Sequence, residues 1–215
     1  MNFLHHAAPY LDDDTLMAVC TGIPDWLSVI DRKIRIRRRM ATVHVDHDDR
    51  FVSAVGRGVS RHIEDDGWFH QTEAFVSLNL RLAVELRERL PSDRGFRPMF
   101  LGHILIEVIL DSRLAVRRPE VLDRYYDAVA ACDAAAVQTA VNQISGRPTD
   151  RLVDVIPRFV EQRFIADYAD DERLLFRMNQ VMRRVGLEPL PGTLVEWLPR
   201  ARSAVADRED GLLTR

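Results

Sequence analysis

The chain has few of the residues that mark whole classes of protein. It contains two cysteines, Cys20 and Cys132, which are too few and too far apart for a disulfide framework and form no CxxC motif. No apolar run approaches the roughly 18 residues that a membrane-spanning helix needs. The first residues also lack the basic and apolar regions of a signal peptide. The sequence therefore predicts a reduced, cytoplasmic protein without a membrane span.

The sequence also has no large excess of positive or of negative charge. The 30 basic and 33 acidic residues give a net charge of -3, so no general basic field favours binding to DNA or RNA. Histidine is absent after His103, and all seven histidines lie in the first half of the chain: His5, His6, His44, His47, His62, His70 and His103. We therefore expect the chemistry of the protein before residue 112.

Helical periodicity is the main pattern from residue 71 onward. It predicts an amphipathic helix over 73–90, a turn over 92–95 and a central, buried helix over 99–114. Further helices are expected over 119–132, 133–144, 150–185 and 193–207, with a frayed tail from residue 211 and a loop at 41–47. No alternating run of β-branched residues predicts a strand. The sequence thus predicts an all-α fold in one domain over residues 1–210, with the motifs in 1–115 and a helical extension in 116–210.

Two segments carry metal-type ligands at helical spacing. His62, Asp66 and His70 recur every four residues, which places them on one face if the segment is helical. His103, Glu107 and Asp111 repeat this spacing inside an apolar helix, where burying such groups costs several kcal/mol, roughly, unless they are paired or bind a metal. A satisfied structural pair is the alternative for each segment.

Two further features lie near the N-terminus. His5–His6 and Asp25 add an isolated pair of histidines and an early carboxylate. The basic run 32–39 either binds a phosphate group or an acidic carrier protein, or is a solvated face. The candidate phosphate-binding residues are Arg35, Arg38 and Arg61. His44 and His47 lie in an acid-rich stretch and are expected to be solvated.

In their order, these motifs resemble those of the acyl carrier protein phosphodiesterase family, which is itself similar to the HD-domain metal phosphohydrolases. The opening Met-Asn-Phe-Leu-His-His is similar to the family's Met-Asn-Phe-Leu-Ala-His, which selects His6 rather than His5. Asp25 matches the family's early Asp, and His62 with Asp66 matches its His-x-x-x-Asp motif. The resemblance covers residues 1–115 and implies an HD-domain-like helical bundle.

The chain departs from the family at two positions. Gly102 stands where the family has the Asp of an Asp-His pair, and His70 stands where it has another Asp. Glu107, one turn after His103, is a candidate replacement for the lost carboxylate. These departures suggest a related hydrolase with an altered substrate or metal.

The resemblance implies a metal-dependent phosphohydrolase, a phosphodiesterase that acts through a metal-activated water. The implied ligands are His6, Asp25, His62, Asp66, His103 and Glu107, with His70 as a further ligand or a supporting residue. Imidazole with carboxylate suits Mn, Fe or Zn. The candidate catalytic carboxylates are Asp66, Asp65 and Asp111. The implied substrate is a phosphoester, one candidate being an ester on acyl carrier protein.

Two other functions remain open at this point. The first is a non-catalytic metal-binding or interaction module that keeps the same helical fold, and the departures at Gly102 and His70 favour it. The second is a zinc-dependent lipid or nucleic-acid phosphodiesterase, which also uses His-x-x-x-Asp and His-x-x-x-Glu on helices. That class would be expected to have an N-terminal Trp ligand and more histidines, and this sequence has neither.

Overall fold

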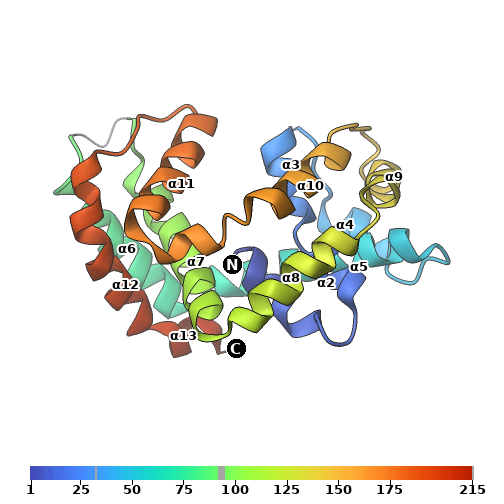
Figure 1. Cartoon of the computed structure of the whole chain (residues 1–215), viewed down its shortest axis with the longest axis horizontal. Coiled ribbons are helices and arrows are strands. Elements are labelled where there is room, and N and C mark those ends of the chain that lie inside the picture. The colour runs from blue at the N-terminus through green and yellow to red at the C-terminus, as the bar shows by residue number, and fades with distance from the viewer. Residues whose placement is uncertain (32, 92–94, 215) are drawn as a thin grey trace. The chain divides into compact units, whose positions relative to one another are not determined.

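The protein is all-α in a computed structural model that describes residues 1–31, 33–91 and 95–214 (Figure 1). Within these ranges the chain forms thirteen α-helices and four short 3₁₀ helices, and no strand. The all-α prediction is therefore confirmed. Arg32, in the basic run, and the expected turn at Ser92–Asp93–Arg94 lie outside the described residues.

The chain divides into two compact units. Unit 1 contains Met1–Asn2, Gly67–Arg117 and Phe164–Arg215, and unit 2 contains Phe3–Asp66 and Arg118–Arg163. Each unit has fully buried apolar side chains, such as Leu105 in unit 1 and Leu4 in unit 2. The single domain expected from the sequence stays a prediction.

Unit 2 is built around a cluster of aromatic side chains. Its helices are α1 (Phe3–Ala7), α2 (Thr15–Cys20), α3 (Ile23–Ile30), α4 (Arg38–Ala41), most of α5 (Arg50–Phe69), α8 (Pro119–Ala131), α9 (Ala134–Ser145) and α10 (Leu152–Gln162). Helix α10 packs against α3, α8 and α9. Phe159 of α10 has its ring centroid 4.9 Å from Phe3 and 5.5 Å from Trp26. Trp26, which follows Asp25, is thus a core residue.

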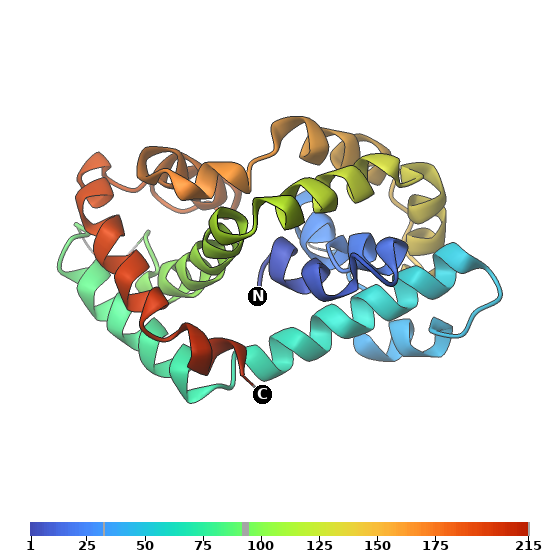
Figure 2. The same cartoon turned by 60° about the horizontal axis from the view of Figure 1, so that its bottom comes forward.

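Unit 1 is centred on two long helices that lie side by side, α6 (Glu73–Arg87) and α7 (Pro98–Arg117) (Figures 1 and 2). Its other helices are α11 (Asp171–Arg184), α12 (Leu198–Ala206) and α13 (Glu209–Leu213). Helix α12 contacts both α6 and α7. A Cβ at Gly102 would lie 2.6 Å from Asn79 Oδ1, so the glycine allows α7 to approach α6 closely.

Local sequence signals set several helix ends where they were expected. The Thr72 side chain accepts a hydrogen bond from the Phe75 N–H and so caps α6. Asp133 caps α9 in the same way, by accepting from two backbone N–H groups. Gly146 follows α9 with a φ of 62°, a conformation that glycine adopts without strain. The helices predicted over 73–90, 99–114, 119–132 and 133–144 are confirmed, with small shifts at their ends.

The continuous helix predicted over 150–185 is wrong. The chain leaves α10 through Arg163, which has a φ of 41°, and passes through a 3₁₀ turn at Ala166–Ala169 before α11 begins. The Asp170 side chain accepts from the Arg173 N–H and caps the new helix. Apolar residues recur at helical spacing in both α10 and α11, so the sequence pattern did not reveal the break between them. It coincides with the boundary between the two units.

Three shorter segments also differ from the prediction. Residues 42–44, expected in a loop, form a 3₁₀ helix after α4, and the segment 193–207 begins with a 3₁₀ helix at Gly192–Trp197. The tail expected to fray from residue 211 instead lies partly in α13. Leu212 is fully buried there, and Glu209 pairs with Arg113 and Arg117. Burial and ion pairing thus hold the end of the chain in place.

Candidate metal centre

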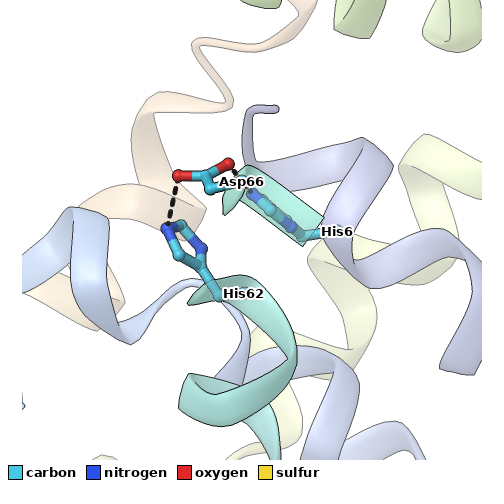
Figure 3. Close-up of side chains that lie close together, drawn as sticks. All are labelled: His6, His62 and Asp66. Atoms are coloured by element: carbon cyan, nitrogen blue, oxygen red, sulfur yellow. Dashed lines mark ion pairs between the residues drawn. The ribbon is translucent and has the colours of Figure 1, made fainter. Parts of the chain in front are cut away.

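Two histidines and one aspartate of unit 2 meet in its interior, and we call them the His6 triad. His6 comes from α1, whereas His62 and Asp66 come from α5 (Figure 3). One ligand atom of each side chain lies within 4.8 Å of the other two. His62 Nε2 is 3.3 Å from Asp66 Oδ2, which confirms that these two residues share one face of a helix. Their meeting with His6 depends on the tertiary fold.

A glycine brings α5 close enough to α2 to orient His62. A Cβ on Gly58 would lie 2.7 Å from Cys20 Cβ and 2.9 Å from the Thr21 nitrogen, so a larger residue would force a shift. One turn later, His62 Nδ1 lies 3.0 Å from the Thr21 carbonyl oxygen. A carbonyl oxygen only accepts, so Nδ1 carries a hydrogen and donates it. Metal-ligating histidines are commonly held in this way by a backbone carbonyl.

The opposite nitrogen of His62 then faces a carboxylate. In the neutral ring, Nε2 presents a lone pair toward Asp66 Oδ2, and two acceptors 3.3 Å apart repel one another. A second proton on His62 removes this repulsion, and so does a cation held between the two atoms. The geometry therefore fits either a charged ion pair or a metal site.

His6 is the most deeply buried member of the triad. It is 0% exposed, and its ring stacks on that of His62 with centroids 4.1 Å apart. Its Nε2 is 3.2 Å from Asp66 Oδ1 and its Nδ1 is 3.7 Å from Asp65 Oδ2. Neither nitrogen is aligned for a good hydrogen bond. Burial by itself lowers the pKa of His6, but Asp65 and Asp66 outweigh it and raise the pKa to about 9.

The carboxylates of this region are held in the ionised form. Burial raises the pKa of Asp66, but contacts with His6 and His62 outweigh burial and hold that pKa far below its usual range. Burial also raises the pKa of Asp65, but His6 and Arg61 outweigh burial and lower that pKa below its usual value. Arg61 contacts both oxygens of Asp65, at 3.1 Å through Nε and 2.9 Å through Nη2. Asp65 thus lies between a fixed guanidinium and the buried ring of His6.

A cavity of about 290 Å³ opens beside the triad within unit 2. His62 forms part of its wall, together with Asp25 and Arg35. The rest of the lining is mainly apolar and comes from Ile23, Pro24, Leu27, Ser28, Ile34, Ile36 and Val59. Asp25, expected among the metal ligands, therefore lies on the wall of the same cavity as His62 but outside the three atoms of the triad.

The structure separates the three arginines expected to bind phosphate. Arg35 lines the cavity, Arg61 pairs with Asp65, and Arg38 forms an exposed ion pair with Glu64 at 2.6 Å. The basic run alternates around Arg35, because Ile34 and Ile36 are buried and the basic side chains between and after them are exposed. Only Arg35 of the three is thus placed where a ligand in the cavity would meet it.

A second group of two imidazoles and one carboxylate lies in unit 1, and we call it the His70 triad. It consists of His70, His103 and Glu107, and one ligand atom of each lies within 4.8 Å of the others. Glu107 Oε1 is 2.8 Å from His70 Nε2 and 3.1 Å from His103 Nε2. His103 and Glu107 share one face of α7, as their spacing predicted. His70 follows the last residue of α5, so it does not continue the helix that carries His62 and Asp66.

The His70 triad is more open to solvent than the His6 triad. The side chains of His70 and His103 are 29% and 36% exposed, and that of Glu107 is 15% exposed. Burial raises the pKa of Glu107, but the Met1 amine at 3.1 Å from Oε1 and the two histidines outweigh it, so the carboxyl is ionised. This triad therefore combines a fixed negative charge with two accessible imidazoles.

The remaining candidates lie outside both triads. Asp111 is fully buried in α7, one turn beyond Glu107, and belongs to neither triad. His5 belongs to neither triad, and His44 and His47 lie near each other with ring centroids 5.7 Å apart. His47 is exposed and accepts a hydrogen bond from the Asp49 N–H, in keeping with a solvated role.

Sequence reasoning missed the partners that come from distant segments. The Thr21 carbonyl that orients His62 is a backbone group and leaves no residue-type signal. The pairing of His70 with Glu107 joins residues far apart in the chain, and spacing alone favoured His70 with Asp66. The sequence implied one list of ligands for one or two ions, whereas the structure groups two histidines and one carboxylate in each of two sets, each within one unit.

Comparison with models of known protein families, with curated proteins and with solved structures finds no match to this chain. Among the described residues, no helix is both long enough and apolar enough to cross a membrane. The two triads and the cavity are therefore the features that indicate a function.

Proposed function

We propose that the protein is a metal-dependent phosphohydrolase, a phosphodiesterase of HD-domain-like build, with the His6 triad as its metal site. The observation that carries the proposal is the arrangement of His62, whose Nδ1 donates to the Thr21 carbonyl while its Nε2 faces Asp66 and its ring stacks on that of His6. A buried imidazole in this orientation directs its metal-binding lone pair at Asp66, and a ligand atom of His6 lies within 4.8 Å of those of His62 and Asp66.

The donor set of the His6 triad fits a transition-metal dication. Two imidazoles and one carboxylate are a set that catalytic zinc sites use, with a further position left for water or substrate. His6 supports the fit, since both of its ring nitrogens are buried without an aligned hydrogen bond. Asp25, on the same cavity wall as His62, is a candidate for a fourth ligand. A divalent metal at such a site supplies a more acidic water and neutralises charge on phosphoryl oxygens.

The protein's own side chains would orient the site. Asp65 faces His6 Nδ1 and is itself fixed by Arg61, so it favours the tautomer in which Nδ1 carries hydrogen and Nε2 is free to bind. Asp25 is near enough to the cavity to accept a proton from a water molecule there. Asp111, fully buried in the other unit, stays a prediction as a catalytic group.

The cavity supports a phosphoester as the substrate. Arg35 offers a guanidinium, which suits phosphate oxygens, while the apolar walls suit the organic group of an ester. A substrate presented by acyl carrier protein agrees with the motifs in residues 1–115 and with the exposed basic side chains around Arg35. The same cavity accommodates other small phosphodiesters.

The test is hydrolysis of bis(p-nitrophenyl) phosphate by the purified full chain loaded with Mn²⁺. Loss of one partner outside the metal shell commonly costs about 10–100-fold in metal affinity or activity, so removing a ligand in His62→Ala or Asp66→Asn should cost at least about 100-fold in kcat/KM. The matched control is His47→Ala, because His47 is exposed and lies in neither triad.

Two results would count against the proposal. Activity that survives in both ligand variants would place the chemistry elsewhere. A wild-type protein that binds Mn²⁺, Zn²⁺ or Fe²⁺ at the His6 triad but hydrolyses no phosphodiester would favour the non-catalytic metal-binding module instead. Circular dichroism spectra of all variants would show whether each one keeps its helical fold.

A further inference from the structure

We infer that the His70 triad is a second, separate site for a divalent transition metal, with all of its protein ligands in unit 1. This inference is independent of the chemistry proposed for the His6 triad. The residues that carry it are His70, His103 and Glu107, whose ligand atoms lie within 4.8 Å of one another.

The convergence of the triad on one atom is the first argument. His70 Nε2 and His103 Nε2 both point at the same oxygen, Glu107 Oε1, at 2.8 and 3.1 Å. The Met1 amine, 3.1 Å from the same oxygen, already neutralises the carboxylate, so a structural role for Glu107 requires neither imidazole. Two imidazoles and a carboxylate that meet at one point instead give three ligand atoms for a single ion, as in zinc sites of the two-histidine, one-glutamate type.

The second argument is that the rings are held in place by neighbours of unit 1. The Phe75 ring lies 5.0 Å from that of His103 at an interplanar angle of 86°, and 4.9 Å from that of His70. Phe69 also contacts His70, with ring centroids 5.4 Å apart. Ligands fixed by packing lose little conformational freedom on binding an ion, so binding is stronger.

The third argument is access. The His70 and His103 side chains are 29% and 36% exposed, so an ion can enter from solvent and retain water in its open positions. Gly102 precedes His103 and lies where a Cβ would meet Asn79 Oδ1 at 2.6 Å. An aspartate at residue 102 would therefore require the Asn79 side chain to move. Glu107, one turn along α7, provides the carboxylate instead.

The chemistry of the three donors defines the class of ion. Imidazole nitrogen with one carboxylate favours Zn²⁺, Co²⁺, Fe²⁺ or Mn²⁺ over Mg²⁺ and Ca²⁺, which prefer oxygen ligands. The partial exposure of the site leaves solvent positions for the ion. Co²⁺ is a suitable probe because its visible absorption reports the ligands around it.

The experiment is equilibrium dialysis of the metal-free full chain against Co²⁺, with ions counted per chain and the visible spectrum recorded. The two sets of three ligands predict about two ions in the wild type, and about one in His103→Ala, in Glu107→Gln and in Asp66→Asn. The combined His103→Ala, Asp66→Asn protein should bind almost none. His47→Ala is the control and should bind as the wild type does.

The outcomes separate this inference from the proposed function. One ion lost only in His103→Ala and Glu107→Gln would support the second site and remove the metal from the His6 triad. One ion lost only in Asp66→Asn would overturn the second site and leave the proposed function standing. An ion count and spectrum that do not change in His103→Ala or Glu107→Gln would overturn the inference, and so would a single ion lost in every ligand variant.

Discussion

The His6 triad and the His70 triad have the same donors in different surroundings. His6 is fully buried and stacks on His62, whereas the side chain of His103 is 36% exposed. Water can hydrate the polar groups of the His70 triad, so bringing these groups together without a metal costs little free energy. In the His6 triad the Asp66 side chain is 29% exposed, but both imidazoles are buried and must find partners inside the protein, because an unpaired buried polar group is unfavourable. Burial therefore makes the His6 triad the stronger indicator of function.

The two triads are also oriented by different means. In the His6 triad a backbone carbonyl, that of Thr21, fixes the ring of His62. In the His70 triad the aromatic ring of Phe75 packs against both imidazoles. A backbone hydrogen bond selects a tautomer, whereas ring packing restricts rotation only. In the His6 triad, the hydrogen bond to Thr21 thus fixes the tautomer of His62 as well as the position of its ring.

The largest expected effect comes from the glycines that allow these helix contacts. Gly58→Ala places a Cβ 2.7 Å from Cys20 Cβ and close to backbone atoms, so α5 must move away from α2. We expect a loss of about 2–3 kcal/mol in the free energy of unfolding, the upper part of the range for overpacking. Gly102→Ala meets the Asn79 side chain at 2.6 Å, which can rotate, and should cost less. Urea unfolding of each variant measures both values.

Gly67→Ala is the matched control in the same helix as Gly58. Among the described residues, no atom outside the adjacent residues and the backbone of α5 lies within 4 Å of a Cβ at this position, so alanine should stabilise α5 by about 0.5–1 kcal/mol. If Gly58→Ala and Gly67→Ala were equally stable, the close approach of α5 to α2 would not be what orients His62. Co²⁺ binding should weaken at the His6 triad in Gly58→Ala and at the His70 triad in Gly102→Ala.

Helical spacing was sufficient to predict the local half of each triad. The pairs His62 with Asp66 and His103 with Glu107 are four residues apart, and both are in contact in the structure. The helices between prolines and glycines were also predictable, because caps and breakers are local signals. Those parts of the fold depend only on neighbours in sequence.

The triad members that come from distant segments of the chain could not be predicted from spacing. The partner that α1 supplies to His62 and Asp66 depends on how α1 packs, and the opening motif selected His6 only through a family resemblance. The ion pair between Arg38 of α4 and Glu64 of α5 also depends on the tertiary fold, whereas Arg61 and Asp65 are four residues apart on α5 and their pair could have been predicted. The break at Arg163 depends on one residue with positive φ, a conformation that arginine rarely adopts.

An intermediate effect should appear in the pH dependence of the metal-free protein. The pKa of His6 is raised to about 9 from the ordinary value of 6.5, so the folded state holds a proton that the unfolded state has lost between these values. The stabilising contribution is complete below pH 6.5 and is lost as the pH rises through about 9. We expect a decrease of roughly 1–2 kcal/mol in the free energy of unfolding between pH 6.5 and 9. The interaction between His6 and Asp66 shifts the pKa of both groups, so it is counted only once.

This pH prediction distinguishes the buried triad from the exposed one. Urea unfolding at several pH values should show the decrease in wild type and in His103→Asn, and a much smaller decrease in His6→Asn. An equal decrease in His6→Asn would mean that another group is responsible for it. The buried thiol of Cys20 is not that group, because burial raises its pKa and its contribution is lost only above pH 9. Added Zn²⁺ should compete with the proton and flatten the profile.

The smallest expected effect concerns the cavity beside the His6 triad. Arg35 lines this cavity, whereas Arg39 is an exposed basic residue of the same run. A charge-assisted contact with a phosphate oxygen at a partly exposed site is worth roughly 1 kcal/mol or somewhat more, so Arg35→Ala should raise KM about five- to tenfold with little change in kcat. Arg39→Ala should leave KM within about twofold, because an exposed charge acts weakly at a distance in salt. Equal increases in KM for the two variants, both abolished at high ionic strength, would mean that the basic run acts as a diffuse field. The cavity would then have no specific phosphate contact, and the buried triad would lose the substrate site that distinguishes it from the exposed one.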